Sequence, residues 1–386
     1  MSPIDDALLD QLRTEGDPLA DEVVSRLFER GQVSAVSDLM TALIRNDGLP
    51  PEILPELIRK YLEQSGDLPQ IDARRIERGE AVFAAYGPEI LMVLGFYSLP
   101  SAYAAKKGVQ VLYRTGYLSQ RPVRRVFETT QMVIDVMRPG GLLGGGSGVR
   151  SAQKVRLMHA AIRHLLRSDV QRPWPQELGC PINQEDLAGT LMTFSFLVLD
   201  GLQKLNILLS RQEQEDYLYA WVVVGRLLGI RDELLPADLS QAEALTRRIY
   251  GRQIAECSEG KAMTQALLVG MQQLVPGSWL DGVPVALIRH FLRQDPFGGL
   301  DLAQLLGVPR ANWTGFGLRA LVWAAGVLNV LGVDSNAAHR RMRKVSLAFL
   351  QGMLLVVRGG QRASFGIPEW LGEQWGLPRP KPGRAG

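Results

Sequence analysis

The stretch KVRLMHAAIRHLL, residues 154–166, decides the fold class, because its apolar side chains recur at the spacing of an α-helix. The residues that share its apolar face are Val155, Met158, Ile162 and either Leu165 or Leu166. Helical spacing also dominates the rest of the chain. No run alternates apolar and polar residues between turn residues, as the strands of a sheet would. We therefore predict an all-α protein.

Glycine and proline clusters divide the chain into its helices. Helices are expected over residues 74–86, 101–115, 122–139, 150–167, 184–209, 210–228, 240–256, 262–274 and 284–293, with short ones within residues 5–62. The glycine-dense sequence PGGLLGGGSG, residues 139–148, lacks the Lys-Ser/Thr of a phosphate-binding P-loop and does not follow a strand. We interpret it as a flexible connection.

The composition is that of an ordinary folded protein. The chain has 386 residues, of which 46% are hydrophobic and 22% are charged, enough for a large core. No Pro/Ser-rich linker separates two halves. We predict one helical domain over residues 1–375, with a disordered tail over residues 376–386.

Charge and targeting features narrow the partners and the compartment. The 43 basic and 40 acidic residues nearly cancel, which argues against nucleic acid as a partner. The N-terminus has no Lys or Arg before Arg13, unlike a secretory signal, and the two cysteines form no CxxC pair. These features favour the cytoplasm.

Two apolar stretches, residues 190–199 and 320–333, are shorter than the roughly 20 residues of a membrane span. No transmembrane segment is therefore expected. Residues 320–333 and 347–357 could instead form a hairpin, and its connection contains five basic side chains: His339, Arg340, Arg341, Arg343 and Lys344. Contact with a membrane surface and a plain solvated loop both remain open for this connection.

Only four histidines are available for metal chemistry: His159, His164, His290 and His339. By helical phase, only His159 lies within the apolar stripe of its helix, so its imidazole is expected to face the core. A hydrogen-bonded core histidine is the simpler interpretation, and it stays open.

The neighbours of His159 favour a cofactor. Arg156 and Arg163 lie three residues before it and four after it, and two cations beside one imidazole imply an anion. Haem needs one axial nitrogen, and its two propionates need donors such as arginine. A non-haem iron or zinc site would need further inward-facing histidines.

A second candidate region lies in the helix expected from residue 122, which is partly apolar on both faces. Arg125, Glu128 and Thr129 then share a poorly solvated stripe at i, i+3 and i+4. They form either an ion pair with a back-bonded threonine or the lining of a pocket in which Glu128 acts as acid or base. Farther along, Thr190 serves either helix packing or hydrogen bonding to a propionate.

Five segments together resemble the MpaB-type oxygenase family, which includes the latex clearing proteins, or rubber oxygenases. They are TGYL (115–118), RRVFET (124–129), KVRLMHAAIR (154–163), PINQEDLAGT (181–190) and ALIR (286–289). The resemblance runs in order along residues 17–310. It implies a haem b protein with a globin-like helical core. By the same resemblance, His159 is the proximal iron ligand, and Arg163, Arg289 and Thr190 bind the propionates.

The resemblance also implies a distal site, where the latex clearing branch carries Arg-x-x-Lys-Thr. This chain reads Arg125-x-x-Glu128-Thr129, so a glutamate replaces the lysine, and an upstream glutamate of that branch aligns with Gln110. These departures and the missing export signal argue against rubber as the substrate. We expect an oxidation of a small apolar, terpenoid, polyisoprenoid or lipid-like molecule by dioxygen, with Arg125, Glu128 and Thr129 as catalytic residues.

Two alternatives come from other classes of protein. A haem-binding sensor or carrier would use the same His159 and arginines without turnover. A purely structural helical protein would bind no cofactor at all.

Overall fold

The computed structural model describes residues 4–30, 56–66, 68, 70–115, 122–205, 207–274, 282–293 and 299–310. All structural statements concern these residues. The predicted basic hairpin, His339 and the predicted tail lie outside them.

The described residues are helical, with no strand among them beyond a single isolated bridge between Ala105 and Ile254. This confirms the all-α prediction. The α-helices are α1 (Asp6–Arg13), α2 (Pro18–Glu29), α4 (Glu56–Gly66), α5 (Ala73–Val93), α6 (Leu99–Tyr103), α7 (Val109–Arg114), α9 (Pro122–Met137), α10 (Ser147–Ser168), α11 (Gln184–Phe194), α12 (Phe196–Lys204), α13 (Arg211–Leu227), α14 (Leu239–Gln253), α15 (Ser258–Leu274), α16 (Gly282–Leu292) and α17 (Leu302–Leu305). Shorter elements are the π-helix η2 (Leu94–Ser98) and the 3₁₀ turns η3 (Gln176–Leu178) and η4 (Asp232–Leu234).

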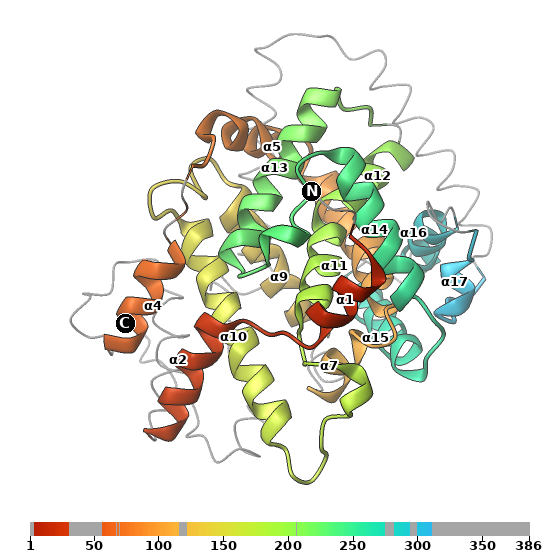
Figure 1. Ribbon diagram of the computed structural model, residues 1–386. Coiled ribbons are helices and arrows are strands. Elements are labelled where there is room, and N and C mark those ends of the chain that lie inside the picture. Colours follow the sequence, from red (N-terminus) through yellow and green to blue (C-terminus); the bar gives the residue numbers. More distant parts are fainter. Residues whose placement is uncertain are drawn as a thin grey trace, which may run out of the picture.

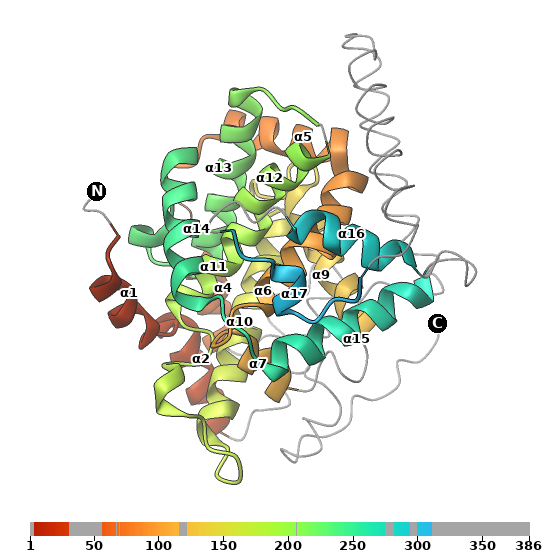
Figure 2. The same cartoon turned by 90° about the vertical axis from the view of Figure 1, so that its right-hand side faces the viewer.

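Helices α5, α9, α10, α11 and α13 form the interior of the structure (Figure 1). Helix α13 packs most extensively against α5, and α10 packs against both α9 and α2. The N-terminal helices pack on two of these interior helices: α1 packs on α11, and α2 packs on α10. Figure 2 shows α15, α16 and α17 together on another side of the molecule.

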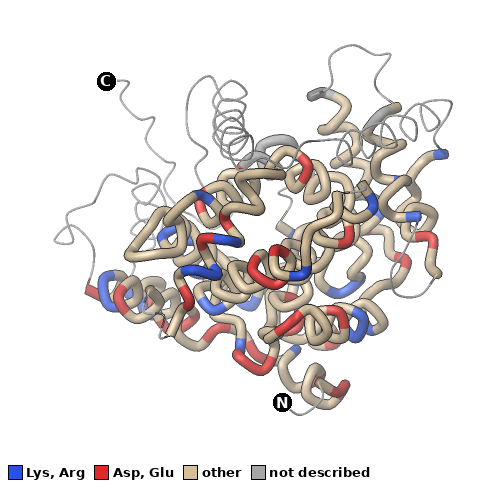
Figure 3. Tube along the Cα trace, turned by 90° about the horizontal axis from the view of Figure 1, so that it is seen from above, with Lys and Arg blue, Asp and Glu red and all other residues tan. Residues whose placement is uncertain are grey.

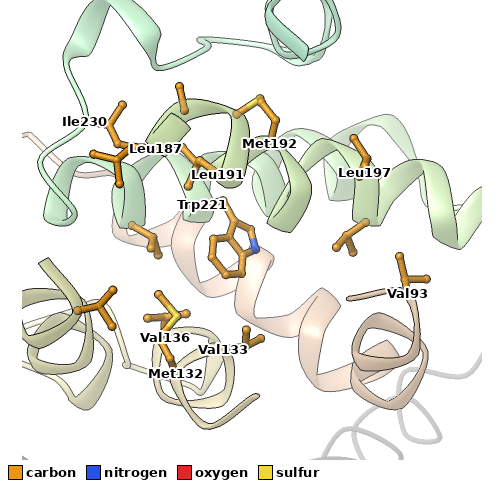
Figure 4. Close-up of a cluster of buried hydrophobic side chains, with 14 of the residues drawn as sticks. Val93, Met132, Val133, Val136, Leu187, Leu191, Met192, Leu197, Trp221 and Ile230 are labelled. Carbon is orange, nitrogen blue, oxygen red and sulfur yellow. The ribbon is translucent and has the colours of Figure 1, made fainter. Parts of the chain in front are cut away.

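The centre of the core is Trp221 of α13, which is 1% exposed. Figure 4 shows its ring between Met132, Val133 and Val136 of α9 and the apolar side chains of α11. A fully buried aromatic ring of this size contributes a large apolar area to folding. Trp221 therefore links the hairpin formed by α9 and α10 to the layer formed by α11 and α13.

Two helix boundaries differ from the prediction. Gly87-Pro88 was expected to interrupt the chain, but α5 continues through it with a kink at Tyr86 (φ −120°, ψ 22°). Proline removes one helical N–H and bends a helix, which need not end when both flanks are packed. Conversely, the helices expected over residues 101–115 and 184–209 are each split, the second at Ser195 (φ −108°, ψ −81°).

One continuous helical segment within the described part of the chain, Ala73–Tyr103, is long and apolar enough to cross a membrane by length and composition alone. Of its most apolar window, 56% is buried inside the protein. A buried core helix has the same composition, so this segment is weak evidence for a span. Figure 3 shows acidic and basic positions interspersed along the described helices.

The glycine-dense connection between α9 and α10 is a close-packed turn, in contrast to the flexible connection predicted from its sequence. The amide of Gly140 donates to the Glu80 carboxylate of α5 (3.0 Å), and the amides of Gly141 and Leu142 lie close enough to favour its charged form. Burial raises the pKa of Glu80, and these amides oppose that shift. Successive N–H groups of this kind form an anion site. The anion that occupies it is the protein's own Glu80.

The substitution Gly148→Ala is expected to destabilise the protein by about 1–3 kcal/mol. A Cβ atom at Gly148 would lie 2.6 Å from the Cα of Val136, which is backbone and cannot move aside. The matched control is Gly251→Ala in α14, where a Cβ meets nothing within 4 Å. This control is expected to stabilise the helix by about 0.5–1 kcal/mol. Urea unfolding followed by circular dichroism measures both, and equal stability of Gly148→Ala and wild type would contradict the close approach.

Candidate functional site

The candidate site is built on the helical hairpin of α9 and α10. Ser151 Oγ donates to Asp135 Oδ2 (2.9 Å), and Ser147 Oγ donates to the backbone oxygen of Asp135 (3.1 Å). At this closed end Gly148 of α10 lies against Val136 of α9. The short turn makes the two helices antiparallel and fixes their register.

That register places the predicted distal residues within about one helical turn of the height of His159 along the hairpin. Both helices rise by the same amount per residue. Counting back along α9 from Val136 and forward along α10 from Gly148 therefore places residues 125–129 level with residues 155–159. Arg125, Glu128 and Thr129 are thus on the turn of α9 that lies level with His159. The side chain of Arg125 is outside the described part of the structure.

Burial differs among these side chains. Glu128 is completely buried, at 0% exposure, whereas Thr129 and His159 are half-buried. The Nδ1 atom of His159 is buried, so the exposed surface of this residue belongs to its other atoms. The prediction that His159 alone faces the core is thus met only in part: its Nδ1 is buried, but the residue as a whole is half-buried, as is His164 on the same helix. A carboxylate and an imidazole of this kind can both transfer protons.

The arginines beside His159 bind aspartates of α2. Arg156 is bidentate on Asp17, through Nε (2.5 Å) and Nη2 (2.8 Å). Arg163 Nε donates to Asp21 Oδ1 (2.7 Å). The inference that two cations here await an external anion is therefore wrong for Arg156. Helical spacing shows which residues share a face, but not which distant segment supplies their partner.

Arg163 differs from Arg156 in having a spare donor. Its Nη1 donates to the backbone oxygen of Ile182 (3.1 Å), but its Nη2 is buried and has no hydrogen-bond partner within the described residues. The side chain is 1% exposed. A buried donor without a partner costs free energy and indicates a missing group, either a water or an anionic ligand. Arg163 is thus able to receive a carboxylate.

Thr190 and Arg289 are engaged elsewhere in the structure. Thr190 is exposed on α11 and donates its hydroxyl to the backbone oxygen of Asp186 (2.8 Å). Arg289 Nη1 donates to the backbone oxygens of Val308 (2.7 Å) and Pro309 (3.2 Å). Helices α10 and α16 lie apart in Figures 1 and 2. The roles of both residues stay predictions.

The other described histidines have aromatic neighbours. The ring of His164 lies 4.3 Å from that of Phe28 in α2, and the ring of His290 lies 5.4 Å from that of Phe291. His164 is therefore an interfacial residue on the α2 side of α10. No group of three or more His, Cys, Asp or Glu in the described ranges could hold a metal ion.

Sequence reasoning missed the two aspartates of α2. Asp17 caps that helix by accepting from the amide of Ala20, and Asp21 lies in its first turn. Acidic residues at these positions are explained by capping and by the helix dipole, so the sequence carries no separate signal for their ion pairs. It also gave no sign that Ile182 has a positive φ (50°), which is strained for a β-branched residue.

Fold and site together define an all-helical protein in which the half-buried His159 shares a helical hairpin with the buried Glu128 and the buried Arg163. The chain matches the family described as "ER-bound oxygenase mpaB/B'/Rubber oxygenase, catalytic domain" over residues 73–385. It therefore belongs to this family, as its sequence motifs indicated.

Two relatives illustrate the similarity. The chain is 30% identical over 267 residues to the rubber oxygenase of Streptomyces sp. (strain K30), covering 68% of this chain and 64% of that protein. The match thus spans less than two thirds of that relative. The solved structure of latex clearing protein in the closed state superposes with a TM-score of 0.66 at 23% identity, over 89% of this chain and 91% of that one. This second likeness supports the fold.

The pH dependence of stability is expected to change in His164→Gln. Burial lowers the pKa of His164 in the folded protein, against the opposing charges of Asp21 and Glu29. The unfolded chain therefore binds the proton first, so this histidine reduces stability as the pH falls through its unfolded value. Thermal midpoints from about pH 7.5 to about pH 5.5 should fall more steeply in wild type than in the variant. Parallel pH profiles would contradict this assignment.

Proposed function

We propose that this protein is a haem-dependent oxygenase that oxidises a small apolar substrate with dioxygen. The observation that carries the proposal is the hairpin itself: His159 is half-buried on α10, level with the turn that contains Glu128, and Arg163 follows one turn later with a buried spare donor. Membership of a family described as oxygenases supports the activity class.

The residues present fit haem better than a metal held by protein side chains. Haem needs one axial nitrogen, which His159 would supply, and its carboxylates need cationic donors, of which the spare Nη2 of Arg163 is one. The described residues contain no cluster with the ligands for a protein-held metal. Haem, when bound, supplies the activation of dioxygen.

The protein's own groups would hold and orient this cofactor. The buried Nδ1 side of His159 faces the protein, which fixes the ring orientation through the groups around it. Arg163 would bind one carboxylate. Arg289 and Thr190 are the further candidates for the carboxylates, and each would have to exchange its present backbone contact for the cofactor.

Residues of α9 would act on the substrate. Glu128, buried in the hairpin, would hold or accept a proton at its carboxylate, and Thr129 would donate a hydrogen bond from its hydroxyl. We assign Arg125 to the same group from its place on α9, as a cation that would orient the reacting molecule.

We further propose that the substrate is terpenoid, polyisoprenoid or lipid-like. The family description and the relative named a rubber oxygenase support an apolar, isoprenoid class. Rubber itself is not proposed, because a glutamate, Glu128, stands where the latex clearing branch has lysine.

The absorption spectrum of the purified protein tests the proposal most directly. A Soret band, present at purification or after addition of hemin, is expected. Its absence after reconstitution would overturn the assignment of a haem. Oxygen uptake that depends on an isoprenoid substrate would then separate an oxygenase from a haem carrier, which consumes none.

His159→Ala is expected to lose the Soret band, whereas His164→Ala should keep it. The two histidines lie on the same helix, but the ring of His164 packs on Phe28 of α2. Hemin titration followed by absorbance measures both variants. Equal retention in the two would contradict the axial role of His159.

Glu128→Gln is expected to keep haem while lowering substrate-dependent oxygen uptake by about 10²-fold, since the amide cannot exchange a proton. The matched control is Asp135→Asn, which neutralises another buried carboxylate of α9 but keeps a side-chain oxygen that can accept the hydrogen bond of Ser151. This control should leave both the haem spectrum and the oxygen uptake unchanged. Unaltered turnover in Glu128→Gln would limit Glu128 to an ion-pair role.

A further inference from the structure

Arg163 is held from two directions by segments that are distant in the sequence. Asp21 of α2 binds its Nε (2.7 Å), and the backbone oxygen of Ile182, just before α11, binds its Nη1 (3.1 Å). These two contacts fix the plane of the guanidinium group. They leave Nη2 as the one nitrogen of this side chain that has no partner within the described residues.

Asp21, the hydrogen-bond partner of Nε, also affects the net charge around Arg163. Arg163 and Asp21 have opposite charges, and the Arg163 side chain is 1% exposed, against 25% for that of Asp21. A carboxylate that reaches Nη2 is attracted by the guanidinium and repelled by Asp21, which is bound at the neighbouring Nε. In a poorly solvated region both forces act over several ångströms.

We propose that Asp21 determines how strongly this site prefers a carboxylated cofactor. It keeps the guanidinium of Arg163 oriented and at the same time cancels part of its charge. Asp21 is thus a specificity-determining residue that acts through Arg163. This inference rests on the proposed haem function, since it takes a haem carboxylate as the group at Nη2.

The backbone conformation of Ile182 indicates that its hydrogen bond with Arg163 is a specific feature of the fold. Ile182 has a φ of 50°, a conformation that an isoleucine adopts only when its surroundings impose it. Its carbonyl oxygen accepts the hydrogen bond from Arg163 Nη1.

Asp21 lies outside the family match, which begins at residue 73. The N-terminal helices of this chain thus add a residue to a site on the family core.

The test compares two porphyrins that differ only in their carboxylates. Hemin and hemin dimethyl ester are titrated into wild type, Asp21→Asn and Asp21→Glu, and the measured quantity is the ratio of their dissociation constants, ester over acid. In Asp21→Asn the side-chain oxygen still accepts from Nε but the negative charge is gone. The preference for hemin should rise about tenfold. Asp21→Glu keeps the charge, so its ratio should stay close to wild type.

The matched control is Asp17→Asn, the same change one turn earlier on α2, at the partner of Arg156. It should raise the ratio less than Asp21→Asn does. An unchanged or lower ratio in Asp21→Asn, or an equal rise in Asp17→Asn, would overturn the inference. A merely structural Asp21 would weaken both porphyrins alike and leave the ratio unchanged.

Two further measurements keep the outcomes separate. Thermal melts by circular dichroism establish that each variant is folded. Asp21→Ser, which is also neutral, provides the same comparison if Asp21→Asn is not folded. If wild type binds neither porphyrin, the proposed function fails together with this inference. If wild type binds hemin and the ratio does not respond to Asp21, only the inference fails.

Discussion

The close approach of α9 and α10 is the constraint on which the candidate site depends. Gly148 has no side chain, so the two helices come together at Val136, and the hydrogen bond from Ser151 to Asp135 fixes their register. That register sets the height of Glu128 relative to His159 along the hairpin. A side chain at Gly148 would push the hairpin apart at its closed end. The chemistry thus depends on a packing contact at the other end of the two helices.

The ion pairs on the other side of α10 constrain the same helix. Arg156 and Arg163 are both buried, and each is bound by an aspartate of α2. A buried charge that loses its partner destabilises the folded protein by several kcal/mol. These ion pairs therefore require α2 and α10 to keep their relative positions. Helix α10 is consequently fixed on one face by charges and on the other by close packing. A helix held in this way can present His159 in a defined orientation.

Much of the fold could be predicted from the sequence, because periodicity identifies helices and their buried faces. The helix of His159 was found almost to its ends, and Val155, Met158 and Leu165 of its predicted apolar stripe are buried, whereas His159 and Ile162 are only half-buried. Packing decided what periodicity could not: α5 continues through Pro88, and the glycine-dense turn is ordered around Glu80. Site residues on one hairpin were predicted together because their register is local. The partners of the arginines were not, since they come from more than a hundred residues away.

The ion pairs of α2 also bear on where the folding unit of this protein begins. The family match starts at residue 73, yet Asp17 and Asp21 lie upstream of it, as does Arg13, which binds the buried Glu185 of α11. A chain trimmed to the family boundary would leave Arg156 and Arg163 of α10 without their aspartates, and Glu185 of α11 with Arg252 as its remaining ion-pair partner. The N-terminal helices are therefore part of the core of this protein. Loss of that segment would require compensating changes at Arg156 and Arg163.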